Sequence, residues 1–173
     1  MNDIKAHYFK KLYIDDSNIS GKGLFAGENI NQGEPILSFG GMFALQKDRY
    51  SGDYLSSTFV GVSETIILCE LINSEKDISD FINHSCNPNV GMLDCITILA
   101  IRNIRKDEEI VCDYAFWEAD EKWKLKNICN CGYEKCRKNI SGLDWKNTKI
   151  TDKNFEFYSP FLKRRIIKNA KQS

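Results

Sequence analysis

Three cysteines near the end of the 173-residue chain constrain its fold more than any other feature. Cys129, Cys131 and Cys136 fall within eight residues, a spacing at which three thiolates can wrap around one zinc ion. A structural zinc site normally has four ligands, so the fourth must come from another part of the chain. Such a ligand would tie the cysteine-rich segment to a distant one. Three unliganded surface thiols are the weaker interpretation, because exposed thiols are reactive.

The candidates for the fourth ligand are the other four cysteines and the two histidines. Cys69, Cys95 and Cys112 lie in apolar, strand-like runs, where a free thiol usually belongs to the core. Cys86 lies instead in a polar segment, residues 81–90, which reads Phe-Ile-Asn-His-Ser-Cys-Asn-Pro-Asn-Val. The residues alone leave the choice among these candidates open.

Length and charge narrow the class of protein. At 173 residues, with 42% hydrophobic residues, the chain is long enough for one domain with a real core. Its 24 basic and 24 acidic residues give a formal charge of zero, and a neutral chain is not expected to bind nucleic acid directly. We find no apolar run typical of a Sec-type signal peptide or a membrane span, so we expect a cytoplasmic protein by default, although export by another route stays open. Clustered thiols in a reducing compartment favour metal over disulfides.

Short apolar runs separated by turn residues predict a mostly β domain. The expected strands lie within residues 12–39, 58–72, 95–101 and 110–112. Residues 41–57 look like an irregular, partly helical insert. Few stretches show the apolar period of a helix; the clearest begins at Pro160 and continues into a short basic helix.

Four segments, in order, resemble those of the SET-domain protein-lysine methyltransferases. They are the glycine loop at residues 21–26, the Asn-His-Ser-Cys-x-Pro-Asn motif at 83–89, the acidic segment ending in Asp-Tyr at 107–114, and the Cys-x-Cys-x4-Cys-Arg segment at 129–137. The resemblance covers about residues 13–145. The chain resembles above all the small stand-alone SET proteins that carry a post-SET zinc segment.

This resemblance implies a SET fold: several small curved sheets with a pseudoknot, a few short helices, a cysteine-rich post-SET tail and a C-terminal helix. It also implies a division of the chain. We expect an N-terminal segment at 1–12, the SET domain at 13–117, the post-SET zinc segment at 118–145 and a C-terminal helical extension at 146–173.

The cofactor implied by the resemblance is S-adenosylmethionine. Lys22, Gly23 and Leu24 are expected to contact it through their backbone, together with Asn83 and the backbone of His84. On the residues alone, the glycine loop is better explained as an ordinary hairpin turn, where glycine accepts a positive φ without strain. The 83–89 motif alone could likewise be a turn whose polar groups satisfy one another.

The resemblance assigns catalysis to Tyr114, whose hydroxyl would orient a neutral lysine amine toward the methyl group. From sequence alone, Tyr114 reads more simply as a buried aromatic at a strand end. Phe39, Cys112 and Phe116 are the residues we expect along the substrate channel. The resemblance also selects Cys86 as the fourth zinc ligand, beside Cys129, Cys131 and Cys136.

Several positions depart from the family pattern. Asp80 stands where an arginine is common, Phe39 lacks the hydroxyl of the usual tyrosine, and Cys112 replaces a bulky aromatic that limits space around the amine. The last two changes predict dimethylation or trimethylation of lysine. The simpler interpretation is that neighbouring side chains fill the space and that Cys112 is a core residue without a role in the channel.

The resulting hypothesis is an S-adenosylmethionine-dependent protein-lysine N-methyltransferase, acting by in-line transfer in an apolar channel. Its expected partner is a protein or peptide bearing a lysine, histone or non-histone, without direct nucleic-acid or membrane binding. One alternative is a SET-like cofactor- or protein-binding module with little turnover, which the changes at Phe39 and Cys112 favour. Another is a zinc-stabilised structural protein that binds no cofactor, which the glycine loop argues against.

Overall fold

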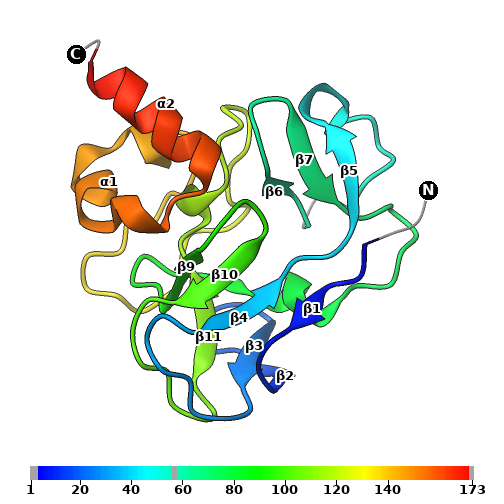
Figure 1. Cartoon of the computed structure of the whole chain (residues 1–173), viewed down its shortest axis with the longest axis vertical. Helices are drawn as coiled ribbons and strands as arrows, with labels where there is room; N and C mark the ends of the chain where they lie inside the picture. The colour runs from blue at the N-terminus through cyan, green and yellow to red at the C-terminus, as the bar shows by residue number, and fades with distance from the viewer. Residues whose placement is uncertain (1–3, 56–57, 172–173) are drawn as a thin grey trace.

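The computed structural model describes residues 4–55 and 58–171 and confirms a mostly β fold with few short helices (Figure 1). Eight strands form one sheet in the order β1-β4-β10-β9-β11-β3-β2, with β8 paired to β11. Their bounds are β1 (His7–Tyr8), β2 (Leu12–Asp16), β3 (Lys22–Ala26), β4 (Pro35–Ser38), β8 (Asn83–His84), β9 (Val90–Met92), β10 (Thr97–Ala100) and β11 (Glu109–Cys112).

Strand β11 is the junction of this sheet. It runs antiparallel to β3 and parallel to both β8 and β9, and it pairs Val111 with Asn83 and Cys112 with His84. Its residues Ile110 and Val111 are β-branched and buried, as a strand with neighbours on both sides requires. The pairing therefore places the 83–84 segment, the glycine loop and the residues after Cys112 next to one another.

A second, three-stranded sheet joins one strand from the expected irregular insert at 41–57 to two strands from residues 58–72, where strands were predicted. It consists of β5 (Met42–Leu45), β7 (Ile66–Cys69) and β6 (Val60–Gly61), in that order. The expectation for residues 41–57 was only partly right: a short 3-10 helix, η1 (Gln46–Asp48), does occur, but β5 precedes it. Strand β5 is held by its pairing with β7, and such tertiary pairing outweighs weak local signals.

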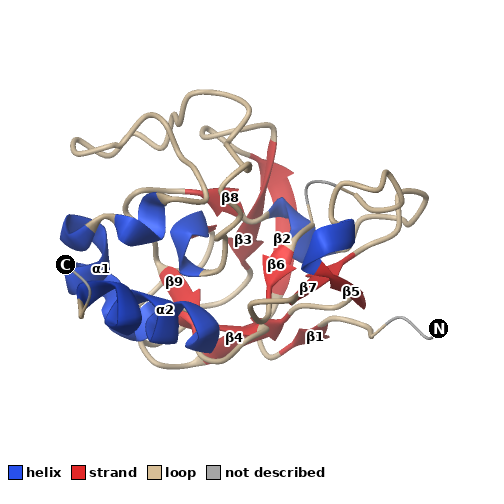
Figure 2. Cartoon of the chain, turned by 90° about the horizontal axis from the view of Figure 1, so that it is seen from above, coloured by secondary structure: helices blue, strands red, loops and turns tan. Residues whose placement is uncertain are grey.

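The C-terminal part is helical, as predicted from Pro160 onward (Figures 1 and 2). It contains η4 (Asp144–Lys146), α1 (Thr148–Asn154), η5 (Phe155–Phe157) and α2 (Pro160–Ala170). Proline suits the first turn of α2 because no intrahelical partner exists there for an N–H group. Phe161 and Leu162 bury the start of α2 in the main core. Within the described residues, no helix is long and apolar enough to cross a membrane.

Candidate functional site

A cavity of about 450 Å³ opens between the small sheet, the end of β11 and the segment that follows it. Aromatic and aliphatic side chains make up much of its wall, and charged groups lie among them. The described residues that line it are Phe39, Gly40, Arg49, Tyr50, Thr58, Phe59, Val60, Ser79, Asp80, Ile82, Tyr114, Trp117, Glu118, Trp123, Lys124, Leu125 and Lys126. Such an apolar cavity with a few polar groups is typical of a ligand site.

Tyr114 enters this cavity from a short 3-10 helix, η3 (Tyr114–Phe116), directly after β11. The preceding Asp113 caps η3 by accepting a hydrogen bond from the Ala115 N–H at 3.0 Å. The Tyr114 hydroxyl donates to the carbonyl oxygen of Ile82 at 2.7 Å. Burial raises the pKa of Tyr114 well above its usual value, with nearby anionic groups adding to the shift. The hydroxyl is therefore protonated at neutral pH, and its oxygen keeps lone pairs that can accept a further hydrogen bond.

Two tryptophans pack against Tyr114 and were not identified from the sequence. The Tyr114 ring centroid lies 5.6 Å from that of Trp117 and 6.0 Å from that of Trp123. Phe39 extends the group through an edge contact with Trp117 at 5.7 Å. The signal available in the sequence was the run of aromatic residues that follows the Asp-Tyr pair.

Of the three residues expected from the sequence to line the substrate channel, one lines this cavity and two are buried elsewhere. Phe39 lines the cavity, but neither Cys112 nor Phe116 is among the described residues that do so. Cys112 is buried in the sheet, where its thiol donates to the Val90 carbonyl at 3.5 Å. Phe116 is buried against Tyr158, with ring centroids 5.1 Å apart. Trp117 therefore lines the wall in place of Phe116, because residues three apart in a 3-10 turn lie on the same face and Trp117 shares that face with Tyr114.

His84 connects Tyr114 to the cysteine cluster. Its Nδ1 accepts a hydrogen bond from the Tyr114 N–H at 3.2 Å, and its Nε2 lies 3.5 Å from the Cys86 sulfur. Burial lowers the pKa of His84 to about 4, although the Asp113 carboxylate acts in the opposite direction. A ring that stays neutral and is held at both nitrogens serves as a connector rather than as a general base.

Asn83 fixes the glycine loop. Its Nδ2 group lies within hydrogen-bond distance of the carbonyls of Ser20 and Lys22, both at 3.1 Å, and of Glu109 Oε1 at 2.9 Å. A Cβ at Gly23 would lie 2.4 Å from the same Glu109 oxygen, so a larger residue there would displace the Glu109 carboxylate. Leu24 is buried in the core, and the exposed Lys22 pairs with Asp16 at 2.6 Å. Direct cofactor contacts by Lys22, Gly23 and Leu24 therefore remain predictions for their backbone groups.

The loop can accommodate the cationic end of an amino-acid-like ligand. No described residue donates a hydrogen bond to Asn83 Oδ1, so this acceptor is available beside the loop. Gly21 has φ +53°, and a Cβ added there would meet no atom within 4 Å. An ammonium group would find an acceptor and open space here, which fits the methionine portion of S-adenosylmethionine.

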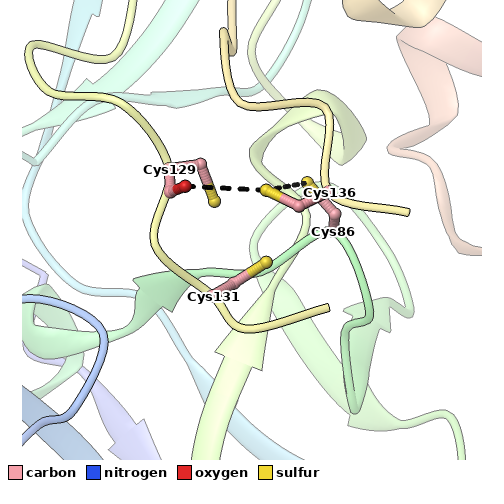
Figure 3. Close-up of side chains that lie close together, drawn as sticks. All are labelled: Cys86, Cys129, Cys131 and Cys136. Atoms are coloured by element: carbon pink, nitrogen blue, oxygen red, sulfur yellow. Dashed lines mark hydrogen bonds between the residues drawn. The ribbon is translucent and has the colours of Figure 1, made fainter. Parts of the chain in front are cut away.

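The four cysteines grouped by sequence also meet in the structure (Figure 3). The sulfur atoms of Cys86, Cys129, Cys131 and Cys136 all lie within 4.8 Å of one another, and those of Cys86 and Cys136 are 3.9 Å apart. Four thiolates at 2.3 Å around a tetrahedral zinc would be separated by about 3.8 Å. Burial raises the pKa of the Cys129 thiol, and coordination to a metal cation would hold this buried sulfur as a thiolate. The donor set and spacing fit zinc.

Backbone N–H groups support the cluster, as metal-site sulfurs require. The Arg137 N–H donates to the Cys86 sulfur at 3.4 Å, and the Lys138 N–H donates to the Cys136 sulfur at the same distance. Lys138, whose N–H makes the second of these bonds, adopts a positive φ of 63°. A positive φ is uncommon for a residue other than glycine, so Lys138 accepts some backbone strain.

Arg137 is a further site residue that sequence reasoning missed. Its guanidinium donates to the two carboxylate oxygens of Asp113 at 2.6 and 2.8 Å, and to Asp144 at 3.0 Å. Asp113 is 1% exposed, so its charge needs such a partner. The one sequence feature that could have identified this pair is its position, since Arg137 follows the zinc-ligand candidate Cys136 and Asp113 precedes Tyr114. The pair joins the cysteine segment to the tyrosine.

Comparison with known proteins gives consistent matches. The family model described as the SET domain matches residues 21–115. A Plasmodium falciparum protein provisionally named histone-lysine N-methyltransferase 1 is 36% identical over 73% of this chain. Human histone-lysine N-methyltransferase 2B is 31% identical over 70%, and an Aspergillus oryzae histone-lysine N-methyltransferase, H3 lysine-4 specific, is 34% identical over 74%. The chain spans only 2%, 5% and 11% of these relatives' own lengths.

A solved structure supports the fold. The crystal structure of KRYPTONITE in complex with mCHG DNA and SAH superimposes with a TM-score of 0.58 and 23% sequence identity. The match covers 77% of this chain and 29% of that one. A second structure of KRYPTONITE, which also contains an H3(1-15) peptide, gives a TM-score of 0.57 over 77% of this chain, with 22% identity.

Proposed function

This chain belongs to the SET-domain family, and from that membership we propose that it is an S-adenosylmethionine-dependent protein-lysine N-methyltransferase. The single observation that carries the proposal is the position of Tyr114, which lines an aromatic cavity while its hydroxyl donates to the Ile82 carbonyl. The relatives' names and the SAH and H3 peptide in the KRYPTONITE complex support the same activity. A lysine-bearing peptide or protein is the proposed substrate, and histone H3 is the first to test.

The proposed chemistry requires the protein to hold the substrate lysine amine in its neutral form and to orient it toward the methyl group. A free lysine has a pKa near 10.4, so neutralising it at pH 8 costs about 3 kcal/mol. Phe39, Trp117 and Trp123 surround the space beside Tyr114 with low-dielectric surface, which disfavours the charged amine. When bound, S-adenosylmethionine supplies an electrophilic methyl carbon on a cationic sulfur. The in-line transfer needs no nucleophilic side chain from the protein.

Tyr114 acts in this proposal as a hydrogen-bond acceptor. Its proton is already donated to Ile82, so its oxygen can accept an N–H from the substrate amine and point the nitrogen lone pair away from itself. The high pKa of Tyr114 argues against a role as an ionised base. Asn83 would hold the glycine loop and offer Oδ1 to the cofactor's ammonium group.

We also propose that Cys86, Cys129, Cys131 and Cys136 hold one structural zinc ion. Four thiolate ligands leave no open position, so the metal would be structural rather than catalytic. It would fix the cysteine segment against the 83–86 segment and, through Arg137, against Asp113.

The experiment that tests the activity is incubation of the full chain with methyl-labelled S-adenosylmethionine and, separately, histone H3, a histone mixture and a cell lysate. Transfer of label to lysine supports the proposal. Saturable cofactor binding by calorimetry, with no transfer to any of these substrates, would favour the alternative of a binding module with little turnover.

A further inference from the structure

A strong separation of charge underlies the formal charge of zero. Residues 146–173 contain eight basic and two acidic residues, a formal charge of +6. The 16 basic and 22 acidic residues that precede them give residues 1–145 a formal charge of −6. The expectation that the chain does not bind nucleic acid came from the total charge alone. It takes no account of this distribution.

The cationic part is a structured surface. Helices α1 and α2 lie side by side at one corner of the molecule, drawn in orange and red in Figure 1 and in blue in Figure 2. Two of the eight cations are paired, Lys146 with Glu121 and Arg165 with Glu64. The other six have no ion pair with any residue in the described ranges 4–55 and 58–171; they are Lys149, Lys153, Lys163, Arg164, Lys168 and Lys171.

The spacing of these cations groups them on helix faces. Lys149 and Lys153 are four residues apart in α1, and both are exposed. Arg164 and Lys168 are four apart in α2, and Lys171 follows at the next turn; all three are exposed. Like charges at this spacing repel and destabilise a helix. In α2, which contains no acidic residue, this repulsion opposes helix stability, and burial of Phe161 and Leu162 in the first turn holds the helix.

The composition of this surface indicates which kind of partner it would bind: a membrane, a protein or a nucleic acid. A membrane-surface helix needs an apolar face to insert, but Phe161 and Leu162 of α2 are buried in the core. Protein interfaces are depleted of lysine at their centres and enriched in exposed aromatic groups. Ile167 is the one exposed large hydrophobic residue among the described residues 146–171. Lysine and arginine without carboxylate partners match the phosphate backbone of a nucleic acid best.

We propose that α1 and α2 form a binding surface for the phosphodiester backbone of nucleic acid, with Arg164, Lys168 and Lys171 as its principal contacts. Binding would be independent of base sequence and strongly dependent on salt, because each neutralised phosphate releases counterions. Such a surface would hold the protein near lysine-bearing proteins that are themselves bound to nucleic acid. The binding does not depend on methyl transfer.

The test is fluorescence anisotropy of the full chain with a labelled mixed-sequence DNA duplex and, in parallel, a single-stranded RNA of equal charge. The variant R164Q/K168Q/K171Q removes three charges from α2. The matched variant K5Q/K11Q/K106Q removes three exposed charges, none of them in an ion pair, from the body of the protein. We expect the α2 variant to bind at least about tenfold more weakly at low salt, with a logarithmic salt slope smaller by about 2.7 for three phosphates.

We expect the matched variant to bind like wild type. Equal losses in the two variants would overturn the proposal, because total charge would then explain the binding. So would wild-type protein that binds neither nucleic acid at about 50 mM salt, or that prefers anionic phosphatidylserine vesicles to both. If the triple variant unfolds, K149Q/K153Q on α1 provides the second measurement: it should weaken binding at an unchanged melting temperature, and wild-type binding would count against the proposed surface.

Discussion

Arg137 donates two parallel hydrogen bonds to Asp113, from Nη1 at 2.6 Å and from Nη2 at 2.8 Å. The arginine follows the last cysteine of the cluster and the aspartate precedes Tyr114, so this ion pair joins the proposed zinc segment to the proposed catalytic residue. Asp113 is almost fully buried, and a buried carboxylate without its partner is costly.

We therefore predict that Arg137→Ala lowers the free energy of unfolding by about 3 kcal/mol, because it leaves the Asp113 charge buried and unpaired. Arg137→Lys keeps the charge but loses the bidentate geometry, and it should be intermediate. Urea denaturation measures both. Arg105→Ala is the control, since this exposed arginine has no ion pair among the described residues. Equal stability of all three variants would show that Asp113 finds other partners.

The second prediction is that Tyr114→Phe keeps the fold but loses most methyl transfer, because the amine loses its acceptor. Steady-state kinetics should show a fall in kcat of about 100-fold or more, the range of one well-placed polar group in an active site. Tyr158→Phe is the matched control: Tyr158 is buried, and its hydroxyl has no hydrogen-bond partner among the described residues. Full activity of the Tyr114 variant would remove this residue from the mechanism.

The third prediction concerns metal. Elemental analysis of the purified protein should give one zinc per chain, and Cys86→Ser should lose most of it. Cys95→Ser is the control, because Cys95 lies in the β9–β10 connection and outside the cysteine cluster. A strong chelator should lower the melting temperature of wild type and of the Cys95 variant alike. Full zinc occupancy in the Cys86 variant would mean that the fourth ligand is a different residue.

Sequence patterns identified the segments that form the site but not how the side chains around it pack. The cysteine triplet was recognisable from its spacing, which zinc coordination sets, whereas the Asn-His-Ser-Cys segment and the Asp-Tyr pair gained their roles only through the family resemblance. The choice between Phe116 and Trp117 at the cavity wall depends on how the η3 turn is oriented against Tyr158, which is a tertiary contact. Strand β5 was missed for a similar reason, since its partner β7 is more than 20 residues away.

The fourth prediction is a pH dependence that belongs to Asp80. Burial raises the pKa of Asp80 to about 6, with the charge of Asp77 adding to the shift. Between pH 4 and pH 6 the folded protein therefore binds more protons at this site than the unfolded chain does. The contribution of Asp80 to stability is then lost as pH rises through that window.

Asp80→Asn removes this titration and can still accept the Asp77 N–H that Asp80 Oδ2 accepts at 2.9 Å. We expect the variant to gain stability relative to wild type as pH rises from 4 to 7, measured by urea unfolding at each pH. Glu134→Gln, at an exposed site, should show no such trend. A constant difference between Asp80→Asn and wild type across this range would show that Asp80 does not titrate within it.

The last prediction concerns the number of methyl groups transferred. From sequence, Phe39 and Cys112 both suggested dimethylation or trimethylation, but the Cys112 thiol donates a hydrogen bond to the Val90 carbonyl inside the sheet. Phe39 lines the cavity and contacts Trp117, so it alone of the two borders the space proposed for the amine. Phe39→Tyr would add a hydroxyl that can hold a less methylated amine, or a water beside it, in one orientation.

We therefore expect mass spectrometry of a methylated H3 peptide to show dimethyl or trimethyl lysine with wild type and a larger monomethyl share with Phe39→Tyr. Cys112→Ala should leave the distribution unchanged, although it removes buried volume and should lower the melting temperature. Wild-type product that stays monomethyl with excess cofactor would contradict the expectation. A shift caused by Cys112→Ala but not by Phe39→Tyr would return the role to Cys112, acting through the sheet rather than at the cavity wall.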